Sequence, residues 1–457
     1  MNSATLLKYD QRVPRYTSYP TAVQFTDAVG PEQHAQWLGE VGLGQAGREE
    51  AVSLYVHVPF CEVLCWYCGC NTQVGRHQST FDAYTDLVCL EIDRVAAKLG
   101  ARPKAAAVHW GGGTPSAIGT ARMARIMDKL REHFDFLPET EIAVEMDPRV
   151  LSPEDIDTLT GEMGVNRTSI GVQDFDAEVQ AAVNRVQPYD LVAETVAQLR
   201  RGGIEDLNLD LMYGLPFQRR DNFSTSADLA VGLQPERMTL FGYAHVPWMF
   251  SHQKLIKESD LPSAEERLVL FDEALQRLEA ADYVHIGLDH FSKSDSEMTI
   301  AQREGRLHRN FQGYTTDTAK TLIAFGASAI STLPGGFIQN KSAARDYMNA
   351  IKADGLGTNR GVGLTDEDRL RSHIIERLMC DFHVDLDAVC DEFGVPVADL
   401  AADLGKLAPL IADELVAVDG WRVDVLPPGR MLVRMACAAF DQYHAPNPDK
   451  PAHARAI

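Results

Sequence analysis

The sequence predicts an α/β fold: a parallel sheet covered by helices, preceded by an N-terminal arm and followed by a mainly α-helical domain. Three observations predict it. Apolar runs rich in β-branched residues recur between residues 52 and 243, segments with helical spacing separate most of them, and the composition changes after residue 363. Strands that alternate with helices indicate a parallel sheet. Six such units are too few for a closed eight-unit barrel, so we expect an open, partial (β/α)6 barrel. A doubly wound sheet is the alternative.

Each strand or helix is predicted from the pattern of apolar residues in its segment. The predicted strands are the apolar runs at 52–58, 105–110, 142–146, 168–172, 207–212 and 238–243. Helices are expected over 81–99, 121–134, 191–199 and 264–281, where apolar residues recur every three or four positions. Residues 285–340 are rich in glycine, histidine and aromatic residues and show little regular pattern.

The chain divides into three predicted parts. Residues 1–50 form an arm, residues 51–355 form the barrel with a C-terminal extension of its sheet, and residues 364–457 form a helical, winged-helix-like domain. The glycine-dense stretch 355–363 predicts a linker. Helices are expected near 366–380, 385–393 and 396–412, followed by a hairpin of 415–418 and 421–425. Its turn signal is Asp419-Gly420.

Charge and length exclude several classes of protein. The 457 residues include 43 Lys and Arg and 65 Asp and Glu, for a net charge of −22. Such an acidic chain does not attract nucleic acid or an anionic membrane through its overall field. The N-terminus lacks the apolar core of a signal peptide, and no run approaches the roughly 18 apolar residues that span a bilayer. We therefore expect a cytoplasmic protein with no nucleic-acid or membrane partner.

Four of the eight cysteines crowd into one loop after the first predicted strand, at Cys61, Cys65, Cys68 and Cys70. Disulfides seldom persist in the cytosol, and buried structural thiols are not clustered in this way. Structural zinc prefers two separated pairs of ligands, and no second pair follows. An iron–sulfur cluster takes closely spaced thiolates from one loop. Cys-x3-Cys-x2-Cys would give three ligands to a four-iron cluster and leave one iron open.

The remaining motifs lie where the predicted strands end. Barrel enzymes place their chemistry at the carboxyl ends of the strands. In chain order these ends hold the cysteine loop, the run Gly111–Gly113, Glu145, Gln173, Asp210 and Ala244. The motifs are therefore expected on one rim. The glycine run could also be only a tight turn, because glycine tolerates positive φ.

The cysteine spacing resembles the signature of the radical S-adenosylmethionine superfamily. A wider match resembles the oxygen-independent coproporphyrinogen III dehydrogenase family of bacterial haem synthesis. The segments that carry it are 14–20 (PRYTSYP), 55–70, 109–115 (HWGGGTP), 145–149 (EMDPR), 171–175 (GVQDF) and 308–316 (HRNFQGYTT). Cys70 and the segment 14–20 favour this family over its haem-chaperone relatives, which typically lack the last cysteine.

The resemblance implies specific site residues. Cys61, Cys65 and Cys68 would hold a [4Fe-4S] cluster, with S-adenosylmethionine at its open iron. Implied contacts of this cofactor are Tyr55, Gly112, Glu145 and Ala244, with Glu145 accepting hydrogen bonds from amino or ribose groups. Positions matching a second S-adenosylmethionine, or an occupant of the substrate site, are Tyr67, Gly113, Thr114, Gln173, Arg185, Asp210 and Ile330. Arg185 could instead be a solvated charge. Cys70 either donates a proton or hydrogen near the substrate or is merely packed.

The implied reaction is the oxidative decarboxylation of two propionate side chains of coproporphyrinogen III to vinyl groups, giving protoporphyrinogen IX. A 5′-deoxyadenosyl radical would start it, after one electron from a low-potential donor such as flavodoxin or ferredoxin. We expect a monomeric enzyme. A haem-binding or haem-transfer protein on the same scaffold is the alternative, and a simple electron carrier is a third hypothesis.

A substrate with four carboxylates needs local positive charge in so acidic a protein. Arg303, Arg306, His308 and Arg309 lie close in sequence, and Arg12 and Arg15 lie in the arm. We hypothesise that one or both groups receive the propionates, Arg15 and Arg309 in particular, the alternative being a solvated surface. The aromatic residues of segment 1–20 are expected to pack on the main domain. The arm then either straps the fold or seals the open side of the barrel.

Overall fold

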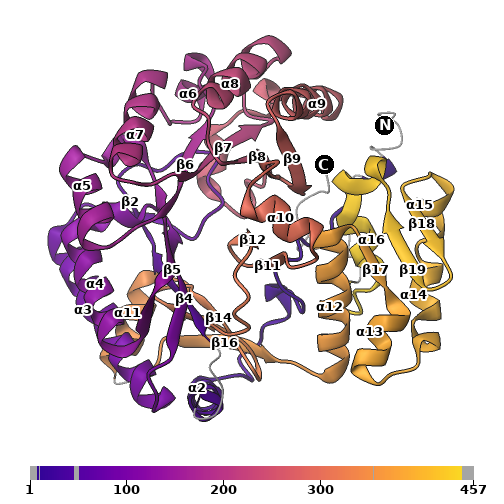
Figure 1. Cartoon of the computed structure of the whole chain (residues 1–457). Coiled ribbons are helices and arrows are strands. Elements are labelled where there is room, and N and C mark those ends of the chain that lie inside the picture. Colours follow the sequence, from indigo (N-terminus) through magenta and orange to yellow (C-terminus); the bar gives the residue numbers. More distant parts are fainter. Residues whose placement is uncertain (1–7, 10, 46–50, 354, 445–457) are drawn as a thin grey trace.

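One mixed sheet organises most of the chain in the computed structural model, which describes residues 8–9, 11–45, 51–353 and 355–444. The sheet has 12 strands in the order β16-β15-β14-β13-β1-β4-β5-β6-β7-β8-β10-β9. Neighbours from β13 to β8 run parallel, and antiparallel strands extend both edges. Figure 1 shows the sheet curving with most of its helices on the outside. The predicted partial α/β barrel is therefore confirmed.

All six predicted strands occur. The parallel strands are β1 (Val52–Val58), β4 (Lys104–Gly112), β5 (Asp135–Met146), β6 (Arg167–Gln173), β7 (Asp206–Tyr213), β8 (Arg237–Gly242) and β13 (Leu322–Phe325). The antiparallel strands are β9 (Tyr283–Gly287) and β10 (His290–Lys293) at one edge, and β14 (Ile330–Leu333), β15 (Gly336–Asn340) and β16 (Thr358–Gly363) at the other. Two small pairs lie apart, β2 (Phe60–Cys61) with β3 (Gln73–Val74) and β11 (His308–Asn310) with β12 (Gly313–Thr315).

Amphipathic helices cover the sheet. They are α2 (Pro31–Gln45), α3 (Gln78–Leu99), α4 (Thr120–His133), α5 (Pro153–Asp157), α6 (Ala177–Ala182), α7 (Tyr189–Arg201), α8 (Arg220–Gly232), α9 (Ala264–Ala280), α10 (Glu297–Arg303) and α11 (Ala344–Lys352). Along α3 the buried residues Phe81, Val88, Ile92 and Val95 form the predicted stripe. Their burial against the sheet fixes the helix in place, because each apolar side chain removed from water contributes about 1.5–3 kcal/mol.

One sequence prediction at the end of the barrel is wrong, because the expected linker 355–363 contains β16. Residues 285–340, which show little regular pattern in the sequence, contain β10 to β15. These strands are only a few residues long and interrupted by glycine, so their alternation is hard to recognise. β13 pairs with β1, and Tyr55 lies opposite Ala324. A contact between residues so distant in sequence has no local signal.

The C-terminal part contains α12 (Asp366–Asp381), α13 (Leu386–Phe393), α14 (Ala401–Gly405), α15 (Ala408–Ala412), α16 (Val433–Ala439) and a sheet of β17 (His383–Asp385), β19 (Arg422–Val425) and β18 (Val416–Asp419). The expected helix 396–412 is broken, and Pro409 lies in the first turn of α15. The hairpin occurs one residue later than predicted. Asp419 pairs with Arg422, so the turn residues are Gly420 and Trp421, and Gly420 supplies the positive φ of +59°.

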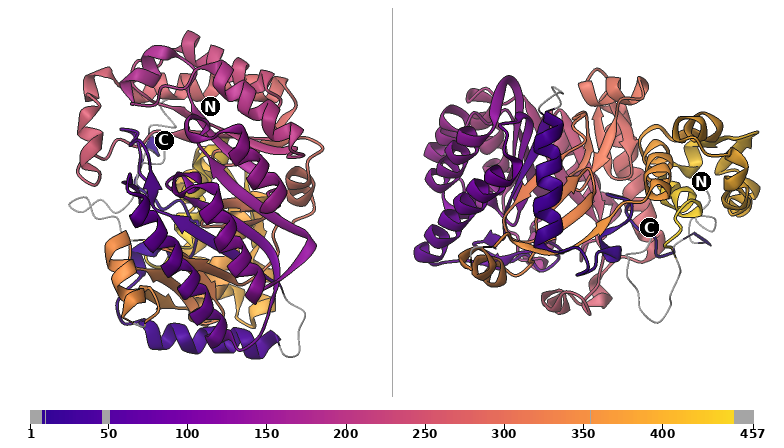
Figure 2. Two further views of the ribbon diagram at one scale, coloured as in Figure 1. Left: turned by 90° about the vertical axis from the view of Figure 1, so that its left-hand side faces the viewer. Right: turned by 90° about the horizontal axis from the view of Figure 1, so that it is seen from below.

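The arm packs mainly on the C-terminal part, and not on the main domain alone as we predicted. Tyr9, Tyr16 and Tyr19 are buried in a hydrophobic cluster that consists mostly of C-terminal residues and includes Leu268 and Leu288 of the main domain. Tyr16 Oη donates to Asp441 at 3.0 Å. The small C-terminal core gains buried apolar surface from these rings, which a domain of its size needs. Figure 2 shows the C-terminal part beside the barrel, with the N-terminal segment running past both. Residues 1–7, 10 and 46–50 of the arm lie outside the described residues.

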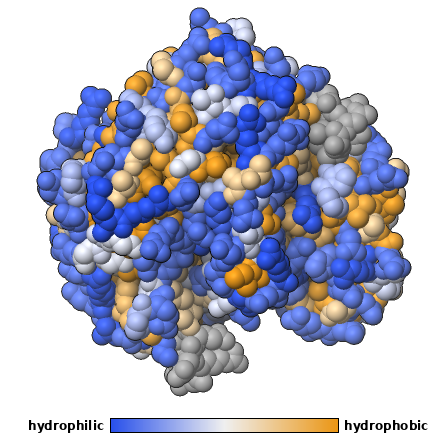
Figure 3. All heavy atoms as spheres, turned by 45° about the horizontal axis from the view of Figure 1, so that its top comes forward, coloured by the Kyte–Doolittle hydropathy of each residue, from blue (hydrophilic) through white to orange (hydrophobic). Residues whose placement is uncertain are grey.

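The face of the molecule in Figure 3 is mostly polar, as expected for a chain with many charged residues, and its apolar residues lie in small scattered patches. Among the described residues, no helix combines the length and the apolar content that a membrane crossing requires. The domain boundaries at 50, 355 and 364 stay predictions.

Candidate active site

A cavity of about 560 Å³ opens at the carboxyl ends of the parallel strands. Its walls come from the loop after β1 and from the ends of β4 to β8. The sequence-predicted residues that line it are Cys61, Cys65, Tyr67, Cys68, Cys70, Gly112, Gly113, Thr114, Glu145, Gln173, Arg185, Asp210 and Ala244. These residues thus lie together on one rim, although they come from positions up to 183 residues apart in the sequence. The volume is suitable for a small molecule.

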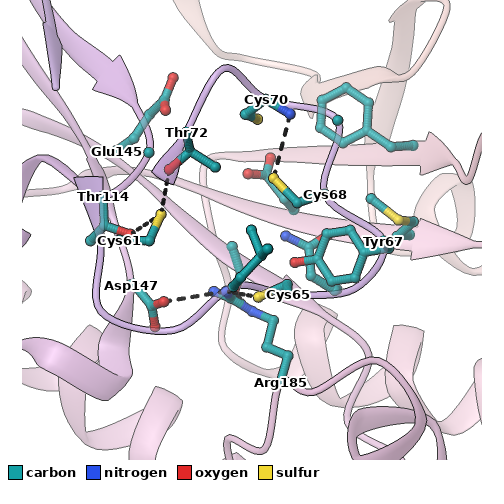
Figure 4. Close-up of a pocket in the computed structure, with 18 of the residues that line it drawn as sticks. Cys61, Cys65, Tyr67, Cys68, Cys70, Thr72, Thr114, Glu145, Asp147 and Arg185 are labelled. Atoms are coloured by element: carbon teal, nitrogen blue, oxygen red, sulfur yellow. Dashed lines mark hydrogen bonds and ion pairs between the residues drawn. The ribbon is translucent and has the colours of Figure 1, made fainter. Parts of the chain in front are cut away.

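The cysteine loop is held in a defined shape. Cys61 ends β2, and the backbone N–H of Cys68 donates to the carbonyl of Cys65 at 3.1 Å. From the opposite side, His252 Nε2 contacts the carbonyl of Cys68 at 2.7 Å and Gln253 Nε2 donates to the carbonyl of Tyr67 at 3.0 Å. Figure 4 shows the sulfurs of Cys61, Cys65 and Cys68 pointing toward a common space.

The spread of these sulfurs fits a cluster better than a single ion. Among the described residues, Asp93, Glu132 and His133 form the one group of three potential ligands whose donor atoms all lie within 4.8 Å of one another. The cysteine sulfurs are therefore spread more widely. A zinc ion with Zn–S bonds of about 2.3 Å would hold its sulfurs only about 3.8 Å apart. The donor set, thiolates from one loop, fits an iron–sulfur cluster.

The acidic group on α3 and α4 is already engaged in ion pairs. Lys129 Nζ lies 3.3 Å from Asp93 and 2.5 Å from Glu132, and His133 Nε2 lies 2.7 Å from Asp93. All of these side chains are at least partly exposed. The group is a surface ion-pair network, and it carries no separate site.

Each cluster cysteine has its own hydrogen-bond partners. Cys61 Sγ lies 3.0 Å from Thr72 Oγ1 and accepts from Thr114 Oγ1 at 3.6 Å. Cys68 Sγ accepts from the backbone N–H of Cys70 at 3.4 Å. Hydrogen bonds from the thiol and the backbone of Cys70 lower the pKa of Cys68. Cys70 itself lines the cavity beside this sulfur.

Two arginines approach the third sulfur. Arg149 Nη2 lies 3.5 Å and Arg185 Nη1 lies 3.4 Å from Cys65 Sγ. Asp147 lies between them and accepts from Arg149 Nη2 at 2.6 Å and from Arg185 Nη1 at 3.3 Å. Burial opposes ionisation of Asp147, but these partners outweigh it and lower its pKa.

The glycine run brings the backbone of β4 close to its neighbours. A Cβ at Gly113 would lie 2.5 Å from the carbonyl oxygen of Phe60 and 2.7 Å from Thr72 Oγ1. Gly112 has a φ of +114°, and a Cβ there would lie 2.6 Å from the ring of His57. Only glycine fits these two positions, so the run is more than a flexible turn.

Glu145 and Asp210 differ in their electrostatics. Burial opposes ionisation of Glu145, but hydrogen bonds with His109 and the backbone N–H of Gly112 outweigh it and lower its pKa. Burial raises the pKa of Asp210 to about 6, although its carboxylate accepts from Asn208 at 2.7 Å. The rim thus holds one carboxylate that is ionised well below neutrality and one that titrates near it.

Gln173 shows the features of a residue held for a ligand. It ends β6 with a φ of +71°, which is rare for a residue other than glycine. Its Oε1 is buried and has no hydrogen-bond partner among the described residues. Backbone strain and an unpaired buried acceptor are costly and persist mainly at functional sites.

Four predicted residues lie outside the lining of this cavity. Tyr55 is on β1, where its hydroxyl contacts His57 Nδ1 at 3.1 Å, and Ile330 begins β14. Arg15 forms an ion pair with Asp289. Arg309 lies with its guanidinium 4.5 Å from the ring centroid of Tyr314. Their assigned roles stay predictions.

The basic residues between 303 and 309, which were expected to form one cluster, do not share a single surface. Arg306 pairs with Glu297 and Glu304 on the surface, and Arg303 is exposed. His308 Nδ1 lies 3.2 Å from Glu376. Residues close in sequence diverge here because α10 ends at Arg303 and the hairpin of β11 and β12 turns inward.

Sequence reasoning missed several residues of the cavity wall. They are Thr72, Met146, Asp147, Arg149, Ser169, Met212, Phe241, Tyr243 and Phe250. Asp147 and Arg149 belong to the segment 145–149, which carries part of the family resemblance. The sequence predicted a function only for Glu145 of this segment. The aromatic residues carried no comparable signal, because isolated aromatics are common in any core.

Comparison with known proteins identifies the family. Residues 55–230 match the model of the radical SAM superfamily, and residues 364–432 match that of the HemN C-terminal domain. An oxygen-independent coproporphyrinogen III oxidase from Bradyrhizobium diazoefficiens is 43% identical to this chain over 448 residues, which cover 98% of each protein. The chain belongs to the oxygen-independent coproporphyrinogen III oxidase family.

Other members of this family agree in sequence and structure. A coproporphyrinogen III oxidase from Salmonella typhimurium is 41% identical over 96% of this chain and 95% of that protein. The solved structure of coproporphyrinogen III oxidase from Escherichia coli, described as a radical SAM enzyme, superposes with a TM-score of 0.90 at 40% identity. It covers 96% of this chain and 99% of the solved one. The predicted family and fold class are therefore confirmed, and the haem-transfer alternative is not favoured.

Proposed function

We propose that this chain decarboxylates two propionate side chains of coproporphyrinogen III to vinyl groups without oxygen, giving protoporphyrinogen IX. Each propionate gives one hydrogen atom from its β-carbon to the 5′-deoxyadenosyl radical, and then releases carbon dioxide and one electron, which passes to an external one-electron acceptor. The single observation that carries the proposal is the cavity, which three clustered cysteines line together with Glu145, Gln173 and Asp210 from successive strands. Family membership over nearly the whole chain supports the same activity.

Cys61, Cys65 and Cys68 would hold a [4Fe-4S] cluster, and S-adenosylmethionine would occupy the cavity beside it. When bound and reduced, this pair supplies a 5′-deoxyadenosyl radical, which side chains alone cannot provide. The chain contributes position and electrostatics. Glu145 receives the positive amino group or the ribose hydroxyls of the cofactor, and the glycines of β4 let its methionine end approach the backbone.

The chain also limits access to the cavity. Phe250 packs over the cysteine loop at Gly69, where a Cβ would lie 3.6 Å from its ring. His252 and Gln253 fasten this cover to the carbonyl groups of Cys68 and Tyr67. Exclusion of water strengthens the electrostatic contacts inside and protects reactive species from side reactions. Cys70 lines the cavity beside Cys68, where it could supply a proton or hydrogen.

Arg309 is well placed to receive a propionate of the substrate. Its Nε and Nη1 are buried and have no hydrogen-bond partner among the described residues. A buried cation without a counter-charge is costly, so an entering carboxylate would be stabilised there. Arg309 Nη2 donates to the carbonyl of Arg15 at 3.4 Å, and Arg15 lies 5.9 Å from the ring centroid of Phe241. Phe241 lines the cavity, so Arg15 lies one side chain away from the cavity and Arg309 lies next to Arg15.

We further infer a low-potential one-electron donor of the flavodoxin or ferredoxin class, because the cluster must be reduced before each turnover. Glu62 and Val63 of the cysteine loop are exposed, which supports approach from outside. A second S-adenosylmethionine, the monomeric state and the cytoplasmic location stay predictions.

The test is anaerobic turnover of the reconstituted full-length protein. With dithionite, S-adenosylmethionine and coproporphyrinogen III, it should release two molecules of carbon dioxide per substrate and form 5′-deoxyadenosine. Without substrate, carbon dioxide should be absent, and a Cys61→Ser variant should form neither product. Tight haem binding without any carbon dioxide release would select the haem-transfer alternative and overturn the proposal.

A further inference from the structure

Positive charge is concentrated on one of the three cluster cysteines. Arg149 Nη2 and Arg185 Nη1 both lie within 3.5 Å of Cys65 Sγ, and this cysteine is only 7% exposed. The other two sulfurs have neutral partners, the hydroxyls of Thr72 and Thr114 for Cys61 and the Cys70 backbone for Cys68. Arginines beside a single ligand make the environment of the site asymmetric.

Arg149 is held in place by a two-point contact. Its Nε donates to Asp147 Oδ1 at 2.9 Å and its Nη2 donates to Asp147 Oδ2 at 2.6 Å. The same carboxylate accepts from the backbone N–H of Arg149 at 3.1 Å and starts the short turn Pro148–Val150. A planar guanidinium fixed in this way loses little further freedom when it donates to a sulfur.

The charges do not cancel. Two arginines and one aspartate leave one net positive charge beside Cys65. Reduction adds one electron to a cluster that is already bound by three thiolates, so the reduced state gains more from nearby positive charge than the oxidised state does. Hydrogen bonds to cluster sulfurs and local charge are among the factors that set such reduction potentials.

We propose that Arg149, clamped by Asp147, raises the reduction potential of the cluster through its hydrogen bond to Cys65 Sγ. Arg149 acts on the cluster through Cys65 and needs no contact with the substrate for this role, so we class it as a positioning residue. The consequence is that electron transfer from a low-potential donor protein to the cluster becomes more favourable. The inference rests on the cluster of the proposed function.

The test compares wild type with Arg149→Met, Arg149→Gln and Arg149→Lys, each as reconstituted full-length protein. The midpoint potential of the cluster is measured by anaerobic redox titration followed by electron paramagnetic resonance, without S-adenosylmethionine or substrate. The potential should become more negative in all three variants. Methionine, which removes charge and donors, should give the largest shift, and lysine, which keeps the charge, the smallest.

A matched control removes one positive charge elsewhere. Arg201 pairs with Glu194 on the exposed face of α7, and both side chains are more than half exposed. Arg201→Met should leave the midpoint potential unchanged, because an exposed charge is screened by solvent and salt. A shift equal to that of Arg149→Met would show a general effect of net charge and overturn the proposal.

The outcomes separate the two proposals. If wild type assembles no cluster, the proposed function itself fails. If all proteins contain the cluster and Arg149→Met keeps the wild-type potential, only the role of Arg149 fails. If all three Arg149 variants fold but lose iron and sulfide, Arg149 is needed for assembly and the tuning role is equally contradicted.

Discussion

Glu145 accepts a hydrogen bond from the backbone N–H of Gly112, with 3.2 Å between Glu145 Oε2 and the nitrogen. Its other oxygen, Oε1, lies 3.3 Å from His109 Nε2. Both contacts come from β4, whereas Glu145 is on β5. The two strand ends thus orient one ionised carboxylate at the cavity before any ligand arrives. Such preorganisation lowers the cost of binding a positively charged group.

Glu145→Gln should weaken S-adenosylmethionine binding by about 10–100-fold, because a hydrogen bond to a charged group contributes about 1.5–3 kcal/mol. The measurement is the dissociation constant for the cluster-loaded enzyme by isothermal titration calorimetry under anaerobic conditions. The exposed Glu139, earlier in β5, serves as control, and Glu139→Gln should bind normally. Unchanged affinity in Glu145→Gln would rule out the assigned contact.

Asp210 should make binding of S-adenosylmethionine at the second position depend on pH. Burial raises its pKa to about 6, so this carboxylate is protonated below that value and charged above it. Because S-adenosylmethionine carries positive groups, affinity should rise as pH increases from 5 to 7. Asp210→Asn should bind more weakly at pH 7 and lose the dependence. Titrations of both proteins at several pH values decide this, and identical pH profiles would contradict the role of Asp210.

Gly113→Ala should disturb the cluster site although it replaces none of the cluster cysteines. The new Cβ would lie 2.5 Å from the carbonyl oxygen of Phe60, in the strand that ends at Cys61. Overpacking of this kind costs about 1–3 kcal/mol. We expect a lower melting temperature and reduced iron content. Gly44→Ala is the control, because a Cβ there meets nothing within 4 Å. Equal behaviour of both variants would contradict the close approach.

Much of the rim could be predicted because each motif is local. The cysteine loop and the glycine run follow apolar runs, Glu145 and Asp210 lie late in theirs, and parallel strands place their carboxyl ends together. Sequence separation is no obstacle to such a prediction. Contacts between side chains of different motifs could not be predicted. The contact of Arg149 with Cys65 is an example, because it depends on how the fold places the two residues.

The strands in the second half of the barrel, in contrast, could not be predicted from the sequence. β13 joins the sheet next to β1 through pairs such as Val56 with Phe325, although it follows a stretch without clear periodicity. Its four residues are buried throughout, and a short buried strand has no polar alternation to reveal it. The arm likewise gave no indication that Tyr16 would reach Asp441, because packing partners are set by the tertiary fold.

Arg309→Glu should impair use of the porphyrinogen and leave the cofactor contacts intact. Replacing a cation by an anion repels the propionate, so the apparent Michaelis constant for coproporphyrinogen III should rise about tenfold or more. Affinity for S-adenosylmethionine should stay at the wild-type value. Arg303→Glu, an exposed position on the same segment, is the matched control. Normal substrate kinetics in Arg309→Glu would remove this residue from the substrate site.

The central claim is that three cysteines, and not four, hold the cluster and leave one iron for the cofactor. The most direct measurement is the iron and sulfide content of reconstituted wild type and of the Cys61→Ser, Cys65→Ser, Cys68→Ser and Cys70→Ser variants. We predict about four irons per chain in wild type and in Cys70→Ser, and a loss of most iron in the other three. Loss of iron in Cys70→Ser to the same degree would contradict the claim, because the cluster would then have four protein ligands and no open iron.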